Sequence, residues 1–209
     1  MKIACVLTTH LPIKAELRRH PELQGKPVII AQELGSRRVV LDWSPQARGM
    51  AQGMPLQEAL SLCQDSILLE ADEPYYQAVF NEILDSLAQR SPLVEGGVVG
   101  CAYVGLDGLE LMYGSEARLT TALLQAVHPD FNPRVGVAEG KFPAYLAAIT
   151  SGPGRATRVP EEVAEFLARF SVNFLPLSWE NKVRLRRFGC TPWGKWPACH
   201  LAQSKPSSG

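Results

Sequence analysis

Short, continuously apolar runs alternate along the first half of this chain with segments of helical periodicity. Residues 73–90 carry the clearest helical pattern, because six apolar side chains recur on one face before Ser91 and Pro92 end the segment. Continuous apolar runs are typical of strands that are buried on both faces of a sheet. We expect strands at 3–7, 28–31 and 39–41, and further helices at 11–20 and 55–63.

The second half of the chain continues this alternation. Such a pattern predicts an α/β chain of the α+β type, with a mixed or antiparallel sheet that carries helices on one face. Beyond Gly152, a stretch rich in Gly, Pro and Arg predicts a linker into a small helical unit, and the last residues show no periodicity. Expected here are strands at 98–104, 109–113 and 134–138, helices at 115–127, 142–150, 161–168 and 178–188, and a loose tail at 199–209.

Charge and cysteine content restrict the compartment and the partners. The 209 residues include 21 basic and 21 acidic side chains, so any attraction to nucleic acid must come from local clusters. Five cysteines, odd in number and without a CxxC pair, favour a reducing compartment. No signal-peptide pattern and no run of membrane-spanning length occurs, so we expect a cytoplasmic protein without membrane contact.

Five sequence blocks stand in an order that is itself informative. The blocks are the opening strand followed by HPELQGKPVII, then RRVVLDWSPQARGMAQGMPLQEALSLC, SPLVEGGVVGCAYVGLDGLEL, RVGVAEGKFPAYLAAITSGPG and FLPLSWENKVRLRRFG. Together they resemble the Y-family of translesion DNA polymerases, of the UmuC/DinB type, over about residues 1–190. The resemblance implies a polymerase-like palm sheet, an inserted fingers subdomain and a small helical thumb. The implied bounds are 1–10 and 73–152 for the palm, 11–72 for the fingers, 153–198 for the thumb and 199–209 for the tail.

The acids that hold the metal ions in active members of this family are replaced here. Leu7 stands at the first position, and Gly100 and Cys101 stand at the second motif. Two-metal phosphoryl transfer needs anionic oxygens, and a thiolate is a poor ligand for hard Mg²⁺. The resemblance therefore implies no catalytic residue, no metal site and no cofactor. Rescue of metal binding by Asp42, Asp107 or Glu110 is the competing interpretation. It is disfavoured because these acids lie on another element or at the far end of the strand.

The other candidate site residues are basic side chains that are candidates for contacting phosphates. Of the contacts that the family makes to the nucleotide phosphates, only Arg48 remains. Gly152 replaces the lysine that follows the last palm helix. Basic side chains on a helix or linker are usually just solvated, so contact with DNA phosphates competes with that interpretation. Similarly, Trp43 could stack on a base or fill the core. The candidate DNA-phosphate contacts are Arg155, Arg158, Lys182, Arg184, Arg186 and Arg187.

Two short segments resemble the ImuB-like branch of the family, whose members are understood as non-catalytic adaptors in SOS mutagenesis. These are His10-Leu11-Pro12 after the first strand and Leu175-Pro176-Leu177 in the thumb region. The resemblance implies a DNA-damage-tolerance adaptor whose partners are a replicative polymerase, the sliding clamp and a RecA-like protein. The little finger and a clamp-binding peptide are not found, so DNA binding is expected to be weak. The alternatives are a weakly active template-directed DNA polymerase that uses Mg²⁺ through atypical ligands, and a relic without a role.

Overall fold

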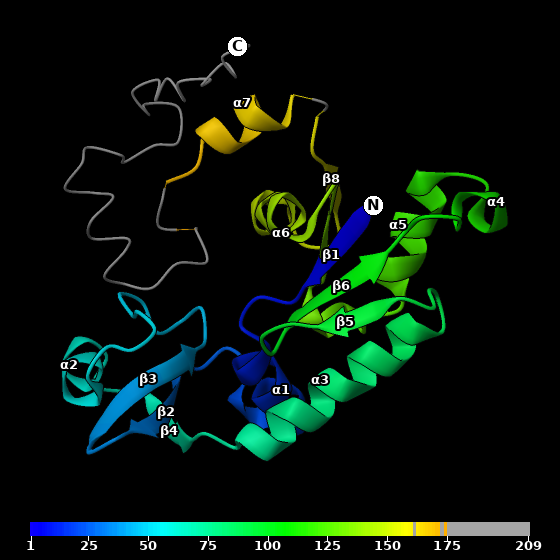
Figure 1. Ribbon diagram of the computed structural model, residues 1–209. Helices are drawn as coiled ribbons and strands as arrows, with labels where there is room; N and C mark the ends of the chain where they lie inside the picture. The colour runs from blue at the N-terminus through cyan, green and yellow to red at the C-terminus, as the bar shows by residue number, and fades with distance from the viewer. Residues whose placement is uncertain (161, 172–173, 175–209) are drawn as a thin grey trace, which may run out of the picture. The chain divides into compact units, whose positions relative to one another are not determined.

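A five-stranded sheet forms the centre of the chain in this computed structural model, which describes residues 1–160, 162–171 and 174 (Figure 1). The central strand β1 (Ile3–Leu7) is antiparallel to both of its neighbours, β6 and β7. The outer strand β8 is parallel to β7. The order is β5 (Val94–Gly96), β6 (Cys101–Gly105), β1, β7 (Arg134–Ala138) and β8 (Ala156–Arg158).

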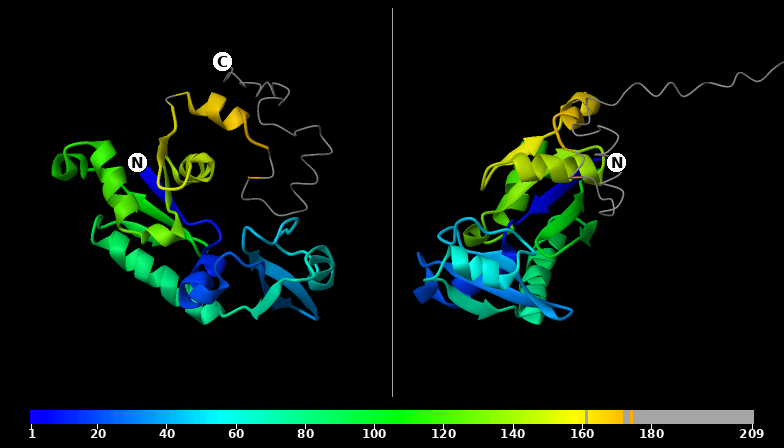
Figure 2. Two further views of the ribbon diagram at one scale, coloured as in Figure 1. Left: turned by 180° about the vertical axis from the view of Figure 1, so that it is seen from behind. Right: turned by 90° about the vertical axis from the view of Figure 1, so that its left-hand side faces the viewer.

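Helices cover both faces of this sheet (Figures 1 and 2). One face packs in the main core with α1 (Leu11–Arg19), α3 (Glu73–Ala88) and α5 (Glu116–Gln125). The other face carries α6 (Lys141–Thr150), which approaches β7 so closely that a Cβ at Gly136 would overlap backbone atoms of Ala144 and Ala148. The prediction of helices on one face only is therefore wrong, because the glycine that admits α6 leaves no hydrophobic signal in the sequence.

A second, three-stranded sheet lies beside α1. It has the order β3 (Arg37–Trp43), β2 (Val28–Leu34) and β4 (Ile67–Glu70), and α2 (Leu56–Leu62) packs against it. Side chains alternate along β2: Val28 and Ile30 belong to the main core, whereas Ile29 and Ala31 pack with α2. This two-sided burial explains why the segment is continuously apolar.

Two helices begin with a side-chain cap. The Asp72 carboxylate accepts the backbone N–H of Tyr75 at 3.1 Å and so begins α3. The Ser115 hydroxyl accepts the N–H of Arg118 at 3.3 Å at the start of α5. Two short 3₁₀ helices, η1 (Pro21–Leu23) and η2 (Pro129–Phe131), follow α1 and α5 along the chain.

The segment from 94 to 113 differs from its prediction. Of the expected strand at 98–104, only residues 101–104 are strand, as part of β6, because residues 97–100 form the turn that joins β6 to the additional strand β5. The expected strand at 109–113 is a short helix, α4 (Glu110–Tyr113), in which Leu111 is 97% exposed. Apolar residues alone indicated a buried strand there, but no neighbouring strand pairs with this segment in the sheets described.

The chain divides into two compact units, Met1–Arg158 and a second one from Val159 onward. The expected linker at 152–160 contains β8, which completes the large sheet of the first unit. In the second unit the described part contains α7 (Val163–Ala168), where the rings of Phe166 and Phe170 lie 5.0 Å apart. The helix expected at 178–188 and the tail at 199–209 lie outside the described residues. Among the helices described, none has the length and apolar character needed to span a membrane.

Candidate active site at the end of the central strand

The three positions that the sequence singled out lie together. Leu7 at the end of β1 is directly opposite Cys101 at the start of β6. Gly100 precedes Cys101, and its carbonyl oxygen accepts the N–H of Thr8 at 2.7 Å. The strand pairing therefore brings Leu7 and Cys101, which are 94 positions apart in sequence, to one point at the end of the sheet.

The backbone at Gly100 excludes a larger side chain. Its φ is +90°, and a Cβ there would lie 2.6 Å from the carbonyl oxygen of Thr8 and 3.3 Å from the Cβ of Leu11. L-residues rarely adopt this backbone region, and the neighbouring atom is main chain that cannot move freely. An acidic side chain at this position would therefore require a shift of the backbone.

Cys101 is part of a buried thiol pair. Its sulfur lies 3.6 Å from that of Cys5, and both residues are buried. The hydrogen bond to Cys101, together with burial, raises the pKa of the Cys5 thiol. Cys5 is therefore a protonated thiol, and both cysteine side chains are packed in the core.

These residues do not fit the magnesium ions that the resemblance implies. Leu7 is buried and has no oxygen in its side chain, Gly100 has no side chain, and Cys101 is turned into the thiol pair. Within the described part of the chain, no group of three His, Cys, Asp or Glu side chains is placed to hold a metal ion. Hard divalent cations need several oxygen ligands, so we derive no step through a metal at this point.

A histidine–aspartate pair links the loop after β1 to the second sheet. The His10 Nδ1 and the Asp42 carboxylate are hydrogen-bonded, and the same carboxylate accepts the N–H of Ile13 at 3.1 Å and that of Trp43 at 2.9 Å. The hydrogen bond to Asp42 raises the pKa of His10. Asp42 thus caps α1 from β3, which explains why this acid is buried and not free for a metal.

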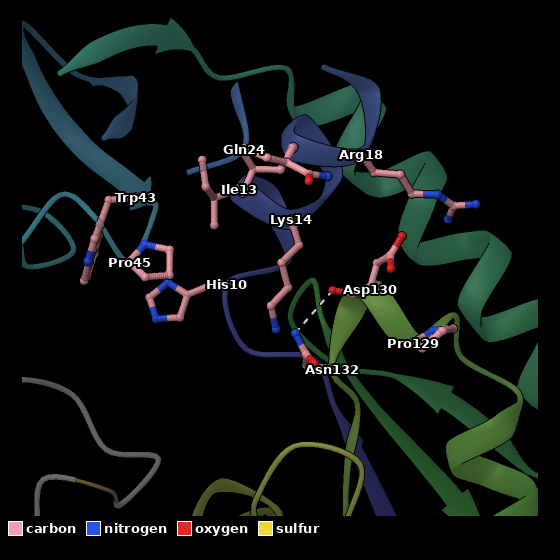
Figure 3. A pocket seen from close by; sticks show the side chains of 11 residues that line it. His10, Ile13, Lys14, Arg18, Gln24, Trp43, Pro45, Pro129, Asp130 and Asn132 are labelled. Carbon is pink, nitrogen blue, oxygen red and sulfur yellow. Dashed lines mark hydrogen bonds between the residues drawn. The ribbon is translucent and has the colours of Figure 1, made fainter. Parts of the chain in front are cut away.

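A pocket of about 650 Å³ lies next to this pair (Figure 3). His10, Trp43 and Pro45 form one side, and η2 forms the other with Asp130 and Asn132. The Lys14 side chain extends into the space between the two sides, and its Nζ donates to the carbonyl oxygen of Phe131 at 2.8 Å. The remaining lining residues are Ile13, Leu17, Arg18, Gln24 and Pro129.

Lys14 and Arg134 are not among the site residues that the sequence predicts. Arg134 begins β7 directly opposite Leu7, on the other side of β1 from Cys101. Its NH1 donates to the carbonyl oxygen of Ile149 at 3.3 Å, while its buried Nε has no hydrogen-bond partner among the described residues. The available signal was a charged residue at the start of an otherwise apolar strand, which by itself is typical of a strand end.

The candidate phosphate contacts are scattered. Arg48 is exposed in the turn after β3 and does not line the pocket. Arg155 and Arg158 are exposed near β8, and Arg158 lies 3.5 Å from the Glu116 carboxylate. Asp107, considered above as a substitute metal ligand, accepts the N–H of Lys2 at 2.9 Å at the opposite end of β1. Lys182, Arg184, Arg186 and Arg187 lie outside the described residues.

Comparison with known proteins identifies many similar sequences and folds. The model of the impB/mucB/samB family matches residues 9–149. A protein of Dehalococcoides mccartyi named DNA polymerase IV is 29% identical over 192 residues, which cover 89% of this chain and 49% of that protein. A protein of Methanoculleus marisnigri with the same name is 33% identical over 169 residues, or 77% of this chain and 47% of that one. The chain spans about half the length of these curated relatives.

Solved structures share the fold. A crystal structure of DinB from Sulfolobus solfataricus aligns with a TM-score of 0.75 at 23% identity, over 92% of this chain and 58% of that chain. An insertion ternary complex of Dbh DNA polymerase aligns with a TM-score of 0.75 at 20% identity, over 92% and 59% of the two chains. The predicted fold class is thereby confirmed.

The named relatives contradict two predictions. The replaced acids predict a non-catalytic protein without a metal cofactor, whereas these relatives are named DNA polymerases, a class of enzyme that uses Mg²⁺. Both predictions are therefore wrong. The physical reason is that Mg²⁺ keeps several waters and also binds substrate phosphates, with only one or two carboxylates from the protein. The side chains at three positions were too narrow a basis for inferring an inactive protein.

Proposed function

Because this chain belongs to the impB/mucB/samB family, the Y-family DNA polymerases of the UmuC/DinB type, we propose that it acts on primer–template DNA in DNA damage tolerance. Its activity in this proposal is template-directed nucleotide addition, with metal ligands that differ from the family pattern. The observation that carries the proposal is the pairing of Leu7 with Cys101, which keeps the family's catalytic positions together at the end of one sheet.

The domain assignment belongs to the same proposal. We assign a palm to residues 1–10 and 73–152, fingers to 11–72 and a thumb to 153–198. The two separate sheets support the first two assignments, because β1, β5, β6 and β7 fall in the palm segments and β2, β3 and β4 fall in the fingers segment. The cytoplasmic location expected from the unpaired cysteines is part of the proposal as well.

Primer extension tests the activity. The purified full chain is incubated with a labelled primer–template and deoxynucleotides, with Mg²⁺ in one series and Mn²⁺ in another. We expect incorporation that follows the template base, and we propose Arg48 as one contact to the incoming triphosphate. Absence of extension with both metals, at a chain concentration that saturates the DNA, would overturn the proposal.

A matched variant excludes a contaminating polymerase. Arg48→Ala removes a positive charge from an exposed turn, so it should leave the fold intact while reducing incorporation by about tenfold or more. Arg118→Ala, at an exposed position on α5, serves as the control and should not change the rate. Incorporation that is equal in all three proteins comes from a contaminant.

An adaptor role is a second candidate, and it does not depend on whether the chain is active. One observation favours it: His10 and Leu11, part of the segment that resembles the ImuB-like branch, are fixed at the start of α1 by the Asp42 carboxylate and by the core. In this role the chain would bind a replicative polymerase, the sliding clamp or a RecA-like protein. Surface-immobilised chain tested against each purified partner checks the role, and absence of binding to all three contradicts it.

A further inference from the structure

We propose that Cys5 and Cys101 form a redox-sensitive modification site, in which hydrogen peroxide joins the two side chains in a reversible disulfide across β1 and β6. The inference goes beyond the proposed function, because it assigns a chemistry to two thiols that nucleotide addition does not use. In the reduced state the pair is packed in the sheet. In the oxidised state it cross-links the end of the sheet where Leu7 and Gly100 lie.

The strand pairing places the two sulfur atoms close together. They lie 3.6 Å apart, which is about 1.5 Å more than the length of a disulfide bond. Cys5 is opposite Tyr103 in the pairing of β1 with β6, and Cys101 is opposite Leu7. The two cysteines are therefore diagonal neighbours on one face of the sheet, an arrangement in which side chains of adjacent strands make contact.

This pair lies on the face of the sheet that α6 covers. Ala4 and Val6, the neighbours of Cys5 along β1, belong to the main core on the opposite face. Cys5 is also opposite Gly136 of β7, where α6 approaches the sheet closely. Cys5 is 0% exposed and Cys101 is 2% exposed. Such burial excludes a bulky oxidant such as glutathione disulfide, so the oxidant in this proposal is a small peroxide.

Access to the pair is through the turn that joins β5 to β6. Cys101 is the first residue of β6, and its N–H donates to the carbonyl oxygen of Val98 at 2.8 Å, which closes the turn. The side chains of this turn are exposed, Val98 at 78% and Val99 at 40%. A strand end beside an exposed turn opens at a lower free energy than the centre of a strand. Local opening therefore admits peroxide to Cys101, whereas Cys5 in the middle of β1 stays covered.

The surroundings of the two sulfurs give them different roles. The hydrogen bond from Cys5 lowers the pKa of Cys101, and a bond from Tyr103 acts in the same direction against the effect of burial. The same pair bond, together with burial, raises the pKa of Cys5. Because the thiolate is the nucleophile, Cys101 reacts with peroxide first and Cys5 completes the disulfide.

The reaction has two balanced steps. In the first, the Cys101 thiolate attacks one oxygen of hydrogen peroxide, the O–O bond breaks, and a sulfenic acid and hydroxide form. In the second, the Cys5 thiol attacks the sulfenic sulfur, the S–O bond breaks, and the disulfide forms while the thiol proton leaves with the oxygen as water. The pair loses two electrons, which the peroxide accepts. A dithiol such as dithiothreitol restores both thiols by exchange.

Closure of the disulfide moves the end of the sheet. Diagonal partners lie about 7–8 Å apart between Cα atoms, whereas a disulfide usually joins Cα atoms about 4.4–6.8 Å apart. Forming the bond therefore draws the start of β6 and the preceding turn toward β1. The hydrogen bond from the Thr8 N–H to the Gly100 carbonyl oxygen, at 2.7 Å, joins the chain at the same point and reports this movement.

Counting of free thiols tests the proposal. Of the five cysteines, Cys63, Cys190 and Cys199 are replaced by Ser in the full-length chain, so that only the pair remains. The folded chain is treated with hydrogen peroxide, denatured and labelled with a maleimide, beside a sample that is reduced with dithiothreitol before labelling. We expect loss of both thiols, their return after reduction, and a monomer whose mass is lower by two hydrogen atoms.

Two outcomes of this experiment overturn the proposal. One is a folded chain that keeps both thiols after peroxide treatment, and the other is a disulfide found only between two copies of the chain. If the chain with three serines fails to fold, peptide mapping of the unchanged chain decides the question. The proposal then requires a peptide linked through Cys5 and Cys101, and links through other cysteines alone contradict it.

Single variants in the same background separate the two sulfurs. Cys5→Ala should stop the reaction after the first step, so that dimedone labels the sulfenic acid at Cys101. Cys101→Ala is the matched variant and should show little labelling, because the Cys5 thiol is buried and protonated. Equal labelling of the two variants would overturn the assignment of Cys101 as the sulfur that reacts first.

Amide NMR spectra test whether the disulfide changes the end of the sheet. The Thr8 amide resonance should shift on treatment with peroxide and return with dithiothreitol, whereas that of Gly105, at the other end of β6, should stay in place. An unchanged Thr8 resonance in the oxidised chain would overturn the conformational part of the proposal. None of these measurements depends on nucleotide addition, so their result is separable from that of primer extension.

Discussion

Gly100 shows how one residue's backbone limits the chemistry of the candidate active site. Its φ of +90° and the carbonyl oxygen of Thr8 at 2.6 Å from an added Cβ exclude a side chain without local rearrangement. The sequence identified this residue only as a missing acid. The structure shows that the backbone at this position has a conformation that favours glycine.

Gly100→Ala should lower the free energy of unfolding by about 2–4 kcal/mol, because backbone strain and a steric contact with Thr8 add together. Gly108→Ala is the matched control, since Gly108 has φ of +81° with no atom within 4 Å of an added Cβ. It should cost only about 1 kcal/mol. Urea denaturation measures the free energy of unfolding of both variants. Equal losses would show that the contact with Thr8 does not contribute to the destabilisation.

His10 should make stability depend on pH near neutrality. Its hydrogen bond to Asp42 raises its pKa above the unfolded value of about 6.5. The stabilisation is therefore fully present below about pH 6.5 and is lost as the pH rises through the folded-state pKa. Histidine titration by NMR should give a lower pKa for His10 in Asp42→Asn. An unchanged pKa in that variant would contradict the role of the aspartate.

At the scale of elements, the packing of α6 on β7 depends on one close approach, at Gly136. The sequence predicted β7 with its correct bounds and α6 to within one residue, because each has a clear local pattern. It could not predict that α6 packs on the second face of the sheet. That packing depends on the absence of a Cβ at Gly136, which periodicity does not register.

Gly136→Ala should destabilise the first unit by about 3 kcal/mol or more, because its Cβ would overlap main-chain atoms of α6 and push the helix from the sheet. Gly152→Ala is the control: an added Cβ there meets only the Arg155 side chain, at 3.4 Å. It should be nearly neutral. Thermal unfolding of both variants checks the prediction, and a small effect at Gly136 would mean that α6 is not held in this position.

Elements were mispredicted where the local sequence pattern and the tertiary contacts favoured different structures. The residues of α4 look like a strand because they are apolar, yet Leu111 and Met112 are 97% and 70% exposed. No neighbouring strand pairs with this segment in the described sheets, and without one an isolated strand gains no ladder of hydrogen bonds. Conversely, β8 was missed because three residues in a Gly/Pro/Arg-rich stretch carry no strand pattern until β7 is beside them.

For the whole molecule, zero formal net charge means that DNA attraction must come from local groups. Arg155 is exposed next to β8 and is one of the candidate phosphate contacts within the described residues. Arg155→Gln should reduce the slope of log affinity against log salt concentration by about 1. Fluorescence anisotropy with a primer–template at several salt concentrations measures this slope. Parallel lines for Arg155→Gln and the Arg118→Gln control would exclude the contact.

The amino-acid sequence by itself determined the fold class, most of the helices and strands, and the three positions that lack acids. These depend on local periodicity, capping and residue type, which are readable without tertiary contacts. Only the tertiary structure decided that Leu7 faces both Cys101 and Arg134, that Asp42 is used to cap α1, and that Lys14 shares a pocket with His10. Strand register and pocket formation join residues from distant parts of the chain, and no local pattern encodes such pairings.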